Sequence, residues 1–280
     1  MHQLYALNLS GAYNVHCVDA LRGLHVLDVS KIVHLTDVEP LQYIRHLNLN
    51  YCLSITTIMA LQRVYTLSLR RCTCVPDIEA GALSQVYDLD LSQTAHLRDI
   101  SSLGEISILN LSSCLQAEEH HLGNLNRVHT LSLSYCGQMS SVTSLAHLHT
   151  VSLISLPELR DVTALKDLHT VNLSWCGHLA DVNALGNVHD LNCTSCSSLV
   201  QVDALARVHT LTLSGCSGIS EVGHLGYVHT LDLSHCRELA GVKFLGRVHA
   251  LNVSGCELTE EDVEALKDVF ELNISNVVTL

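Results

Sequence analysis

A block of about twenty residues recurs from one end of the chain to the other, and this repeat limits the possible folds more than any other feature. Its clearest copies are residues 208–216, 228–236 and 248–256, which read VHTLTLSGC, VHTLDLSHC and VHALNVSGC. No linker or break in composition interrupts the series, so we expect one domain of about 14 units over residues 1–280. The fourth residue of the block recurs at Leu7, Leu27, Leu47, Leu67, Leu89, Leu109, Leu131, Val151, Val171, Leu191, Leu211, Leu231, Leu251 and Leu272.

The pattern within one unit is VHTLxLSxCxxLxDVxALxx, and we number its positions 1 to 20 from the Val. Apolar residues at positions 4 and 6 are two apart, as in a β-strand, whereas the later apolar positions are three apart. Each unit therefore predicts one short strand and a tight return, which places the next strand parallel to it at about 4.8 Å. The predicted strands are 5–9, 25–29, 45–49, 65–69, 87–91, 107–111, 129–133, 149–153, 169–173, 189–193, 209–213, 229–233, 249–253 and 270–274.

The order LxxLxLxxC followed by xxLxDVxxL resembles the leucine-rich repeat over residues 4 to about 276, with Cys where many members have Asn. The first half resembles the cysteine-containing repeats of F-box substrate receptors, and the short return resembles that of internalins. The resemblance implies a mainly β solenoid, a right-handed superhelix or horseshoe with one long parallel sheet on its concave face. It also implies short turns or 3-10 segments on the convex face.

The return is too short for a full helix in each unit, and the sequence predicts a single short helix near 259–267. Thr259 can cap this helix, and three acidic residues fill its first turn. Neither end of the series shows the polar cap that solenoids need. We therefore expect the chain to be part of a longer protein, or its ends to be covered by partners or by self-association.

The chain is acidic, with a formal net charge of −13, and its densest basic stretch is the pair Arg70-Arg71. Such a chain is a poor partner for nucleic acid or for an anionic membrane surface. It shows no signal-peptide pattern and no apolar stretch of transmembrane length. Unpaired thiols, and N-x-S/T sequons whose glycans would crowd the concave face, favour a reducing, cytoplasmic setting.

Cysteine fills position 9 in nine units. This column can be interpreted as a ladder of disulfides or metal ligands, or as a column of buried thiols. Ile32 and Leu156 replace Cys in this column and can neither pair nor bind a metal, so we favour buried thiols. Acidic residues at position 14 are interpreted as caps of backbone N–H groups at the return, not as catalytic carboxylates. The two columns are Cys52, Cys72, Cys114, Cys136, Cys176, Cys196, Cys216, Cys236 and Cys256, and Asp37, Asp77, Asp99, Glu119, Asp161, Asp181 and Glu221.

Histidine fills position 2 in eight units, and Tyr or Phe takes the same place in others. A column of stacked rings that shields the strand edge is the favoured interpretation. A pH switch is an alternative, although neighbouring charges would depress the pKa values of these imidazoles. A Zn²⁺ or Ni²⁺ column is a remoter alternative, because no carboxylate recurs beside the rings, and we predict no metal site. The eight residues are His25, His129, His149, His169, His189, His209, His229 and His249.

Serine, histidine and aspartate are plentiful, but the repeat supplies them in equivalent columns, whereas catalysis needs one singular constellation. The sequence has no glycine-rich phosphate loop, no nucleophile elbow and no HExxH motif. We therefore predict a protein that is not an enzyme and needs no cofactor.

Positions 3, 5, 7 and 8 are predicted to form the concave face, which is mostly Thr, Asn and Ser. Binding energy concentrates in a few Trp, Tyr and Arg side chains, so residues that depart from these columns are the candidates. We predict a protein-binding scaffold or adaptor, with a ubiquitin-ligase substrate receptor, an internalin-like host-interaction protein and a metal or pH sensor as alternatives. The candidate contact residues are Tyr51, Arg70, Arg71, Tyr135, Ile154, Trp175, Asp190 and Asp232.

Overall fold

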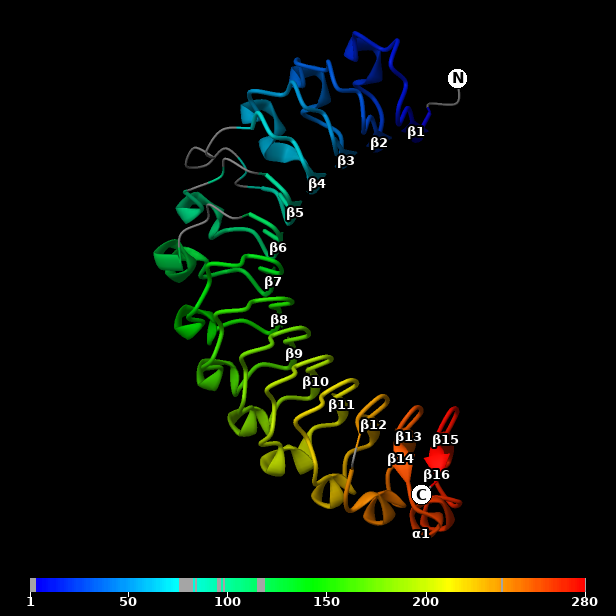
Figure 1. Cartoon of the computed structure of the whole chain (residues 1–280). Coiled ribbons are helices and arrows are strands. Elements are labelled where there is room, and N and C mark those ends of the chain that lie inside the picture. The colour runs from blue at the N-terminus through cyan, green and yellow to red at the C-terminus, as the bar shows by residue number, and fades with distance from the viewer. Residues whose placement is uncertain are drawn as a thin grey trace. The chain divides into compact units, whose positions relative to one another are not determined.

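The computed structural model describes residues 4–279 except 76–82, 84, 95–96, 98, 115–118 and 238, and gives no side chains for 119–121. The chain divides into two compact units, Met1–Cys136 and Gly137–Leu280, and each is a series of strands and returns (Figure 1). The sequence analysis predicted one domain and no boundary at residue 136.

The strands of each compact unit pair in parallel with their neighbours in chain order, and equivalent leucines face each other, as Leu27 faces Leu47. In the first unit they are β1 (Ala6–Asn8), β2 (Val26–Asp28), β3 (His46–Asn48), β4 (Thr66–Ser68), β5 (Asp88–Asp90), β6 (Ile108–Asn110) and β7 (Thr130–Ser132). In the second they are β8 (Thr150–Ser152), β9 (Thr170–Asn172), β10 (Asp190–Asn192), β11 (Thr210–Thr212), β12 (Thr230–Asp232), β13 (Ala250–Asn252) and β15 (Glu271–Asn273). This is the leucine-rich-repeat β-solenoid that the spacing predicted.

Each strand occupies only positions 3 to 5 of its repeat, so it is shorter than the predicted five residues. The residue before it still belongs to the ladder, because its carbonyl accepts two amides of the next repeat, as Tyr5 O accepts from His25 N and Val26 N. Position 8 takes a left-handed backbone conformation and turns the chain away, but its N–H still donates to position 7 of the next repeat, as Gly11 N does to Ser30 O at 2.8 Å.

The returns carry short 3-10 turns, as predicted for the side opposite the sheet. They are η1 (Asp19–Leu21), η2 (Glu39–Leu41), η3 (Met59–Arg63), η4 (Ser101–Leu103), η5 (Glu119–Asn124), η6 (Thr143–Leu145), η7 (Thr163–Leu165), η8 (Asn183–Leu185), η9 (Asp203–Arg207), η10 (Gly223–Leu225) and η11 (Val242–Leu245).

One α-helix, α1 (Glu260–Ala265), lies within the predicted range. Thr259 and Asp262 form a capping box at its start, in which each side chain accepts the backbone N–H of the other residue. The short strands β14 (Glu257–Leu258) and β16 (Val278–Thr279) flank α1 and β15 in the chain and pair in parallel. Among the described residues, none of the helices has the length and apolar character needed to cross a membrane.

The core of each compact unit is a stack of equivalent aliphatic layers. One complete layer is Val208, Leu211, Leu213, Cys216, Ile219, Val222 and Leu225, and all seven are buried. These are positions 1, 4, 6, 9, 12, 15 and 18, as predicted. A single repeat cannot close such a core, so its stability depends on neighbours stacked on both sides.

Candidate functional site

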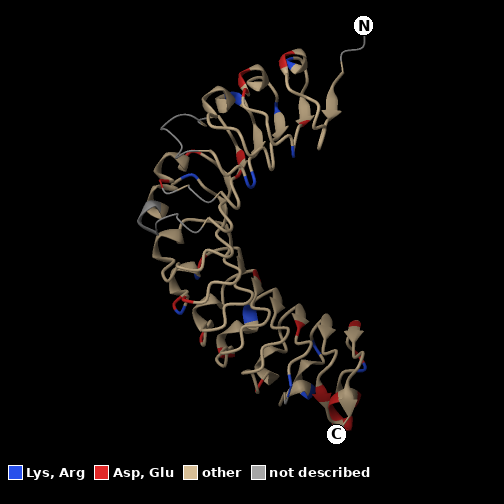
Figure 2. Ribbon diagram, turned by 45° about the horizontal axis from the view of Figure 1, so that its top comes forward, with Lys and Arg blue, Asp and Glu red and all other residues tan. Residues whose placement is uncertain are grey.

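We call the side of each sheet that carries the side chains of positions 3 and 5 the open face. In β11, for example, Thr210 and Thr212 are half-exposed, whereas Leu211 between them is buried. Most of the strand ribbon carries neither Lys, Arg, Asp nor Glu in either compact unit (Figure 2). The open face is therefore mainly a surface of hydroxyl and amide groups.

A turn at the end of each strand fixes the border of the open face. The side-chain oxygen of Asn or Asp at position 5 accepts the backbone N–H of position 7, as Asn172 Oδ1 does from Ser174 N at 3.0 Å. Asp232, a predicted contact residue, has this role toward Ser234 N at 2.8 Å. The other residues that act in this way are Asn8, Asp28, Asn48, Asp90, Asn110, Asn192, Asn252 and Asn273.

The serines of position 7 were predicted to face outward, and for five of them this prediction is wrong, whereas Ser10 is exposed and Ser112, Ser214 and Ser254 are half-buried. Ser30, Ser92, Ser134, Ser174 and Ser234 are buried. The turn folds position 7 back toward position 5, where Ser174 Oγ donates to Asn172 Oδ1 at 2.6 Å. The Asn of position 5 and the Ser or Thr of position 7, which match a glycosylation sequon, thus form a structural turn.

Position 8 follows this turn, and its residues have positive φ throughout the series. Tyr51, Arg71, Tyr135 and Trp175 have φ values of 63°, 62°, 64° and 65°. An L-residue in this region costs about 1–2 kcal/mol relative to the right-handed form. Large side chains kept in a strained conformation are typical of functional positions. The sequence analysis missed this conformation, although glycines at Gly11, Gly215 and Gly255 signalled it.

The first group of predicted contact residues lies together in the first compact unit. The Arg71 guanidinium lies over the Tyr51 ring, 5.6 Å from its centroid. Tyr51 N donates to Arg70 O at 2.9 Å, which places Arg70 and Arg71 beside Tyr51 on the next repeat. Both arginines are exposed, so the three residues form a cationic and aromatic patch.

The second predicted group is divided between the compact units. Tyr135 belongs to the first unit and is 55% exposed, whereas Ile154 and Trp175 belong to the second. Ser155 N donates to Ser174 O at 2.8 Å, so Ile154 and Trp175 follow the ends of neighbouring strands β8 and β9. Trp175 is 62% exposed, an unusual state for a residue type that is mostly buried.

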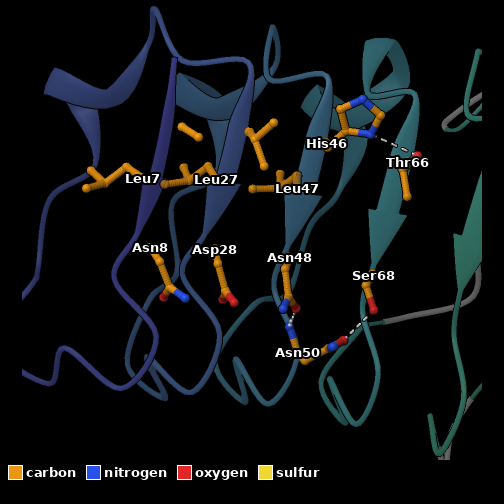
Figure 3. A pocket seen from close by; sticks show the side chains of 12 residues that line it. Leu7, Asn8, Leu27, Asp28, His46, Leu47, Asn48, Asn50, Thr66 and Ser68 are labelled. Carbon is orange, nitrogen blue, oxygen red and sulfur yellow. Dashed lines mark hydrogen bonds between the residues drawn. The ribbon is translucent and has the colours of Figure 1, made fainter. Parts of the chain in front are cut away.

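A depression of about 620 Å³ on the open face of β1–β4 was not predicted (Figure 3). Small apolar side chains at position 3, Ala6 and Val26, stand where other repeats have Thr and form part of the floor of the depression. Polar groups surround this floor: His46 Nδ1 lies 3.1 Å from Thr66 Oγ1, and Ser68 Oγ donates to Asn50 Oδ1 at 2.6 Å. Ala6 and Val26 at a position that is otherwise mostly Thr were the available sequence signal.

The histidines of position 2 form the predicted ring column. In the second compact unit His149, His169, His189, His209, His229, His249 and Phe270 follow one another with ring centroids 4.5–4.8 Å apart. Burial lowers the pKa of His229 from its ordinary value, and the neighbouring His209 and His249 lower it further. Repulsion from its neighbours thus disfavours the charged form of His229, in the direction that the sequence analysis expected.

Asp190, another predicted contact residue, lies beside this column at position 3 of β10. Its Oδ1 is 3.0 Å from His189 Nδ1, and its Oδ2 is 3.4 Å from Thr170 Oγ1. Burial raises the pKa of Asp190, but hydrogen bonds from Thr210 and His189 outweigh it, and the pKa lies below its usual value.

The column cysteines are free buried thiols, which agrees with the favoured interpretation. Each donates to the carbonyl of position 6 in the preceding repeat, as Cys216 Sγ does to Cys193 O at 3.0 Å. Burial raises the pKa of Cys216 to about 12. Thr94 takes the same place in another repeat, and its hydroxyl donates to Leu91 O.

The acids of position 14 cap the start of the 3-10 turns, which confirms their structural interpretation. Asp161 Oδ1 accepts Thr163 N at 2.9 Å, and a backbone hydrogen bond from Thr163 lowers the pKa of Asp161. Asp37, Asp99, Asp181 and Glu221 act in the same way. Asp77 and the side chain of Glu119 lie outside the described part of the chain.

Neither a protein-family model nor a curated protein matches the sequence. Solved structures do match in fold. The crystal structure of an internalin from Listeria monocytogenes is 19% identical, with a TM-score of 0.62, over 99% of this chain and 82% of that one. The TLR13–ssRNA13 complex is 17% identical, with a TM-score of 0.67, over 98% of this chain and 51% of that one.

The functional domain of InlJ from Listeria monocytogenes, described as including a cysteine ladder, is also similar. It is 14% identical, with a TM-score of 0.55, over 97% of this chain and 63% of that one. At these identities the likeness concerns the fold alone.

Proposed function

We propose that this chain, which has the leucine-rich-repeat fold, is a non-enzymatic scaffold or adaptor that binds another protein through the open face. The observation that carries the proposal is the placement of large aromatic and basic side chains at position 8. There the backbone strain would be relieved by glycine, yet Tyr51, Arg71, Tyr135 and Trp175 occupy it. Interfaces concentrate their binding energy in these three residue types.

The solved structures support this proposal in a general way. One of them, by its description, is a complex of TLR13 with single-stranded RNA. For the present chain we propose a protein partner, because a net charge of −13 opposes the approach of a polyanion. The cationic Tyr51–Arg71 patch favours an acidic segment of that partner.

Affinity capture with matched variants tests the proposal. Trp175→Gly removes the ring and suits the left-handed backbone, so the fold is retained. Tyr227→Ala is the control, because Tyr227 is 76% exposed but follows η10 on the return side. We expect a partner retained by the wild type and the control to be lost from Trp175→Gly. Equal capture by all three proteins would contradict a role for the open face at Trp175.

Two finer versions of the proposal follow from the resemblance of the repeats. One is a substrate receptor of a ubiquitin ligase, and the other is an internalin-like surface or host-interaction protein. Twelve free cysteines favour the first, in the cytoplasm, because such thiols oxidise in secretory compartments. Localisation of the full-length gene product separates the two, since a host-interaction protein would be found outside the cell.

A second copy of the chain is an alternative partner. Ile274 and Val278, beside β15 and in β16, are exposed apolar residues. Sedimentation of the wild type over a range of concentrations would show self-association, and Val278→Lys would be expected to reduce it.

A further inference from the structure

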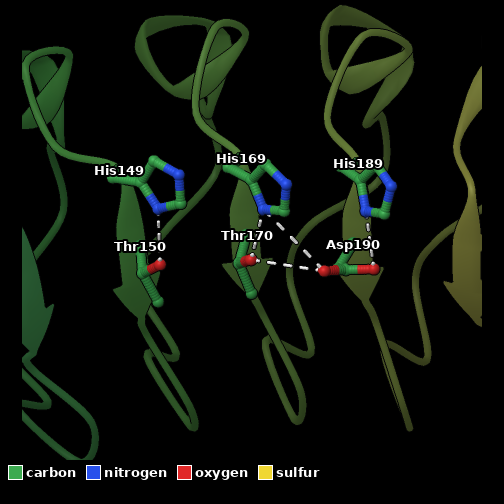
Figure 4. A network of polar contacts seen from close by, with 6 residues as sticks. All are labelled: His149, Thr150, His169, Thr170, His189 and Asp190. Carbon is green, nitrogen blue, oxygen red and sulfur yellow. Dashed lines mark hydrogen bonds and ion pairs between the residues drawn. The ribbon is translucent and has the colours of Figure 1, made fainter.

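Three metal-ligating side chains meet at the start of β9 and β10 (Figure 4). Asp190 Oδ1 lies 3.0 Å from His189 Nδ1, and Asp190 Oδ2 lies 3.9 Å from His169 Nδ1. Within the described part of the chain, they form the one group of three His, Cys, Asp or Glu residues whose donor atoms, one from each residue, all lie within 4.8 Å of one another.

The separations suit a small divalent ion. Zn²⁺ binds imidazole nitrogen and carboxylate oxygen at about 2.0–2.2 Å, so donors around a tetrahedral ion lie about 3.4 Å apart. The observed separations of 3.0 and 3.9 Å bracket this value. To bind one ion, the stacked His169 and His189 rings would tilt toward each other, so that the in-plane lone pairs of both Nδ1 atoms meet near the Asp190 carboxylate.

The fold holds these donors in place. The His169 and His189 rings stack at 4.6 Å with an angle of 15° between their planes, and both turn Nδ1 toward position 3. Thr170 Oγ1 donates to Asp190 Oδ2, which orients the carboxylate as an outer partner of a metal site does. The hydrogen bond from Thr170 thus orients the carboxylate before an ion binds, and the stack keeps both imidazoles beside it.

Asp190 distinguishes this place from the rest of the column. Position 3 is Thr at the equivalent points Thr150, Thr170, Thr210 and Thr230, and a threonine hydroxyl lies beside Nδ1 of His149 and His229. A neutral hydroxyl is a poor ligand, whereas a carboxylate adds charge and a strong oxygen donor.

We propose that His169, His189 and Asp190 form a binding site for a divalent transition-metal ion such as Zn²⁺, a function separate from the protein-binding role. The three side chains supply two nitrogens and one oxygen. They are 44%, 48% and 37% exposed, so the ion enters from solvent and keeps open coordination positions there. The sequence analysis predicted no metal site because no carboxylate recurs beside the imidazole rings. A single carboxylate is sufficient for a single site.

Calorimetric titration with Zn²⁺ tests the site, using the full chain without a polyhistidine tag. Cys17 and Cys74 are exposed thiols, so both are changed to Ser in every protein compared. We expect one site that saturates. Asp190→Thr restores the usual residue of position 3 and should weaken binding at least ten-fold. Asp190→Thr with unchanged affinity would overturn the proposal.

Two further variants show whether a loss of Zn²⁺ affinity comes from the site itself. One controls for the change in net charge, and the other removes a second ligand of the site. Asp232→Asn removes the same charge from the same face but keeps its turn, as Asn192 and Asn252 do, and should bind normally. A loss equal to that of Asp190→Thr would show a general charge effect and overturn the site. His169→Gln should weaken binding as Asp190→Thr does.

A gain of function provides the reciprocal test. Thr230→Asp places a carboxylate beside His229 and after His209, in the arrangement of Asp190 with His189 and His169. We expect the stoichiometry to rise from one ion to two per chain. A stoichiometry that stays at one would contradict the claim that an acid at position 3 completes the site.

Discussion

At the residue scale, repetition makes the exceptions informative. Position 8 has a left-handed backbone in every repeat that the structure describes there, and glycine satisfies it only at Gly11, Gly215 and Gly255. Elsewhere the chain tolerates strain to place side chains such as Tyr135 and Trp175 at the border of the open face. The sequence identified these residues through their departure from the columns. Glycines at the same position of other repeats signalled the left-handed backbone, but the sequence analysis did not extend it to the other residues of the column.

The cysteine column leads to a prediction at the same scale. Burial raises the pKa of Cys52 to about 11 and that of Cys72 to about 12. These thiols therefore stay protonated and unreactive at neutral pH, since the thiolate is the nucleophile. We expect the exposed Cys17 and Cys74 to react rapidly with a thiol reagent at pH 8, and the buried thiols only after unfolding.

The same raised pKa gives a pH dependence of stability. An unfolded thiol ionises near about 8.5, below the folded value. Stability from the burial of Cys52 and Cys72 is thus complete below that pH and is lost as the pH rises through their folded pKa values of about 11 and about 12. Rapid modification of the column thiols in the native protein, or stability that rises above pH 9, would contradict their burial.

At the element scale, the spacing of the repeat predicted a strand in each unit and the burial of seven positions. The strands are shorter than expected, and the position-7 serines are buried, because the side chain of position 5 draws the chain into a tight turn. Apolar periodicity carries no information about hydrogen bonds between a side chain and its own backbone. The recurring Asn and Asp at position 5 were visible but were interpreted as surface residues.

Asn172 tests the importance of this turn. Its Oδ1 accepts both Ser174 N and Ser174 Oγ; Asn172→Ala leaves Ser174 N without this acceptor, whereas Ser174 Oγ keeps Asn192 Oδ1 at 3.0 Å. We expect the free energy of unfolding to fall by about 1–3 kcal/mol. Asn172→Asp keeps the acceptor, as Asp232 shows in another repeat, and should be nearly neutral in a urea titration. Equal losses in both variants would show that the amide has some other role.

At the scale of the molecule, the fold was predictable and the site only in part. The same spacing recurs in fourteen units, and each unit independently predicts one strand and one return. This recurrence defines the solenoid. The division into Met1–Cys136 and Gly137–Leu280 was not predictable, because no change of composition accompanies it. The Tyr51–Arg71 contact and the His169–His189–Asp190 cluster join residues twenty apart. The period of twenty placed these residues in equivalent positions of neighbouring repeats, but the directions and distances of their side chains come from the structure.

Hydrogen exchange of the chain with and without a captured protein partner tests the central claim most directly. If the partner binds the open face, amides around β9 and β10 and the turn at Trp175 will exchange more slowly in the complex. Amides of η8 and η9, on the return side of the same repeats, will be unchanged. Protection confined to the 3-10 turns, with β9, β10 and Trp175 unaffected, would contradict the assignment of the open face as the binding surface.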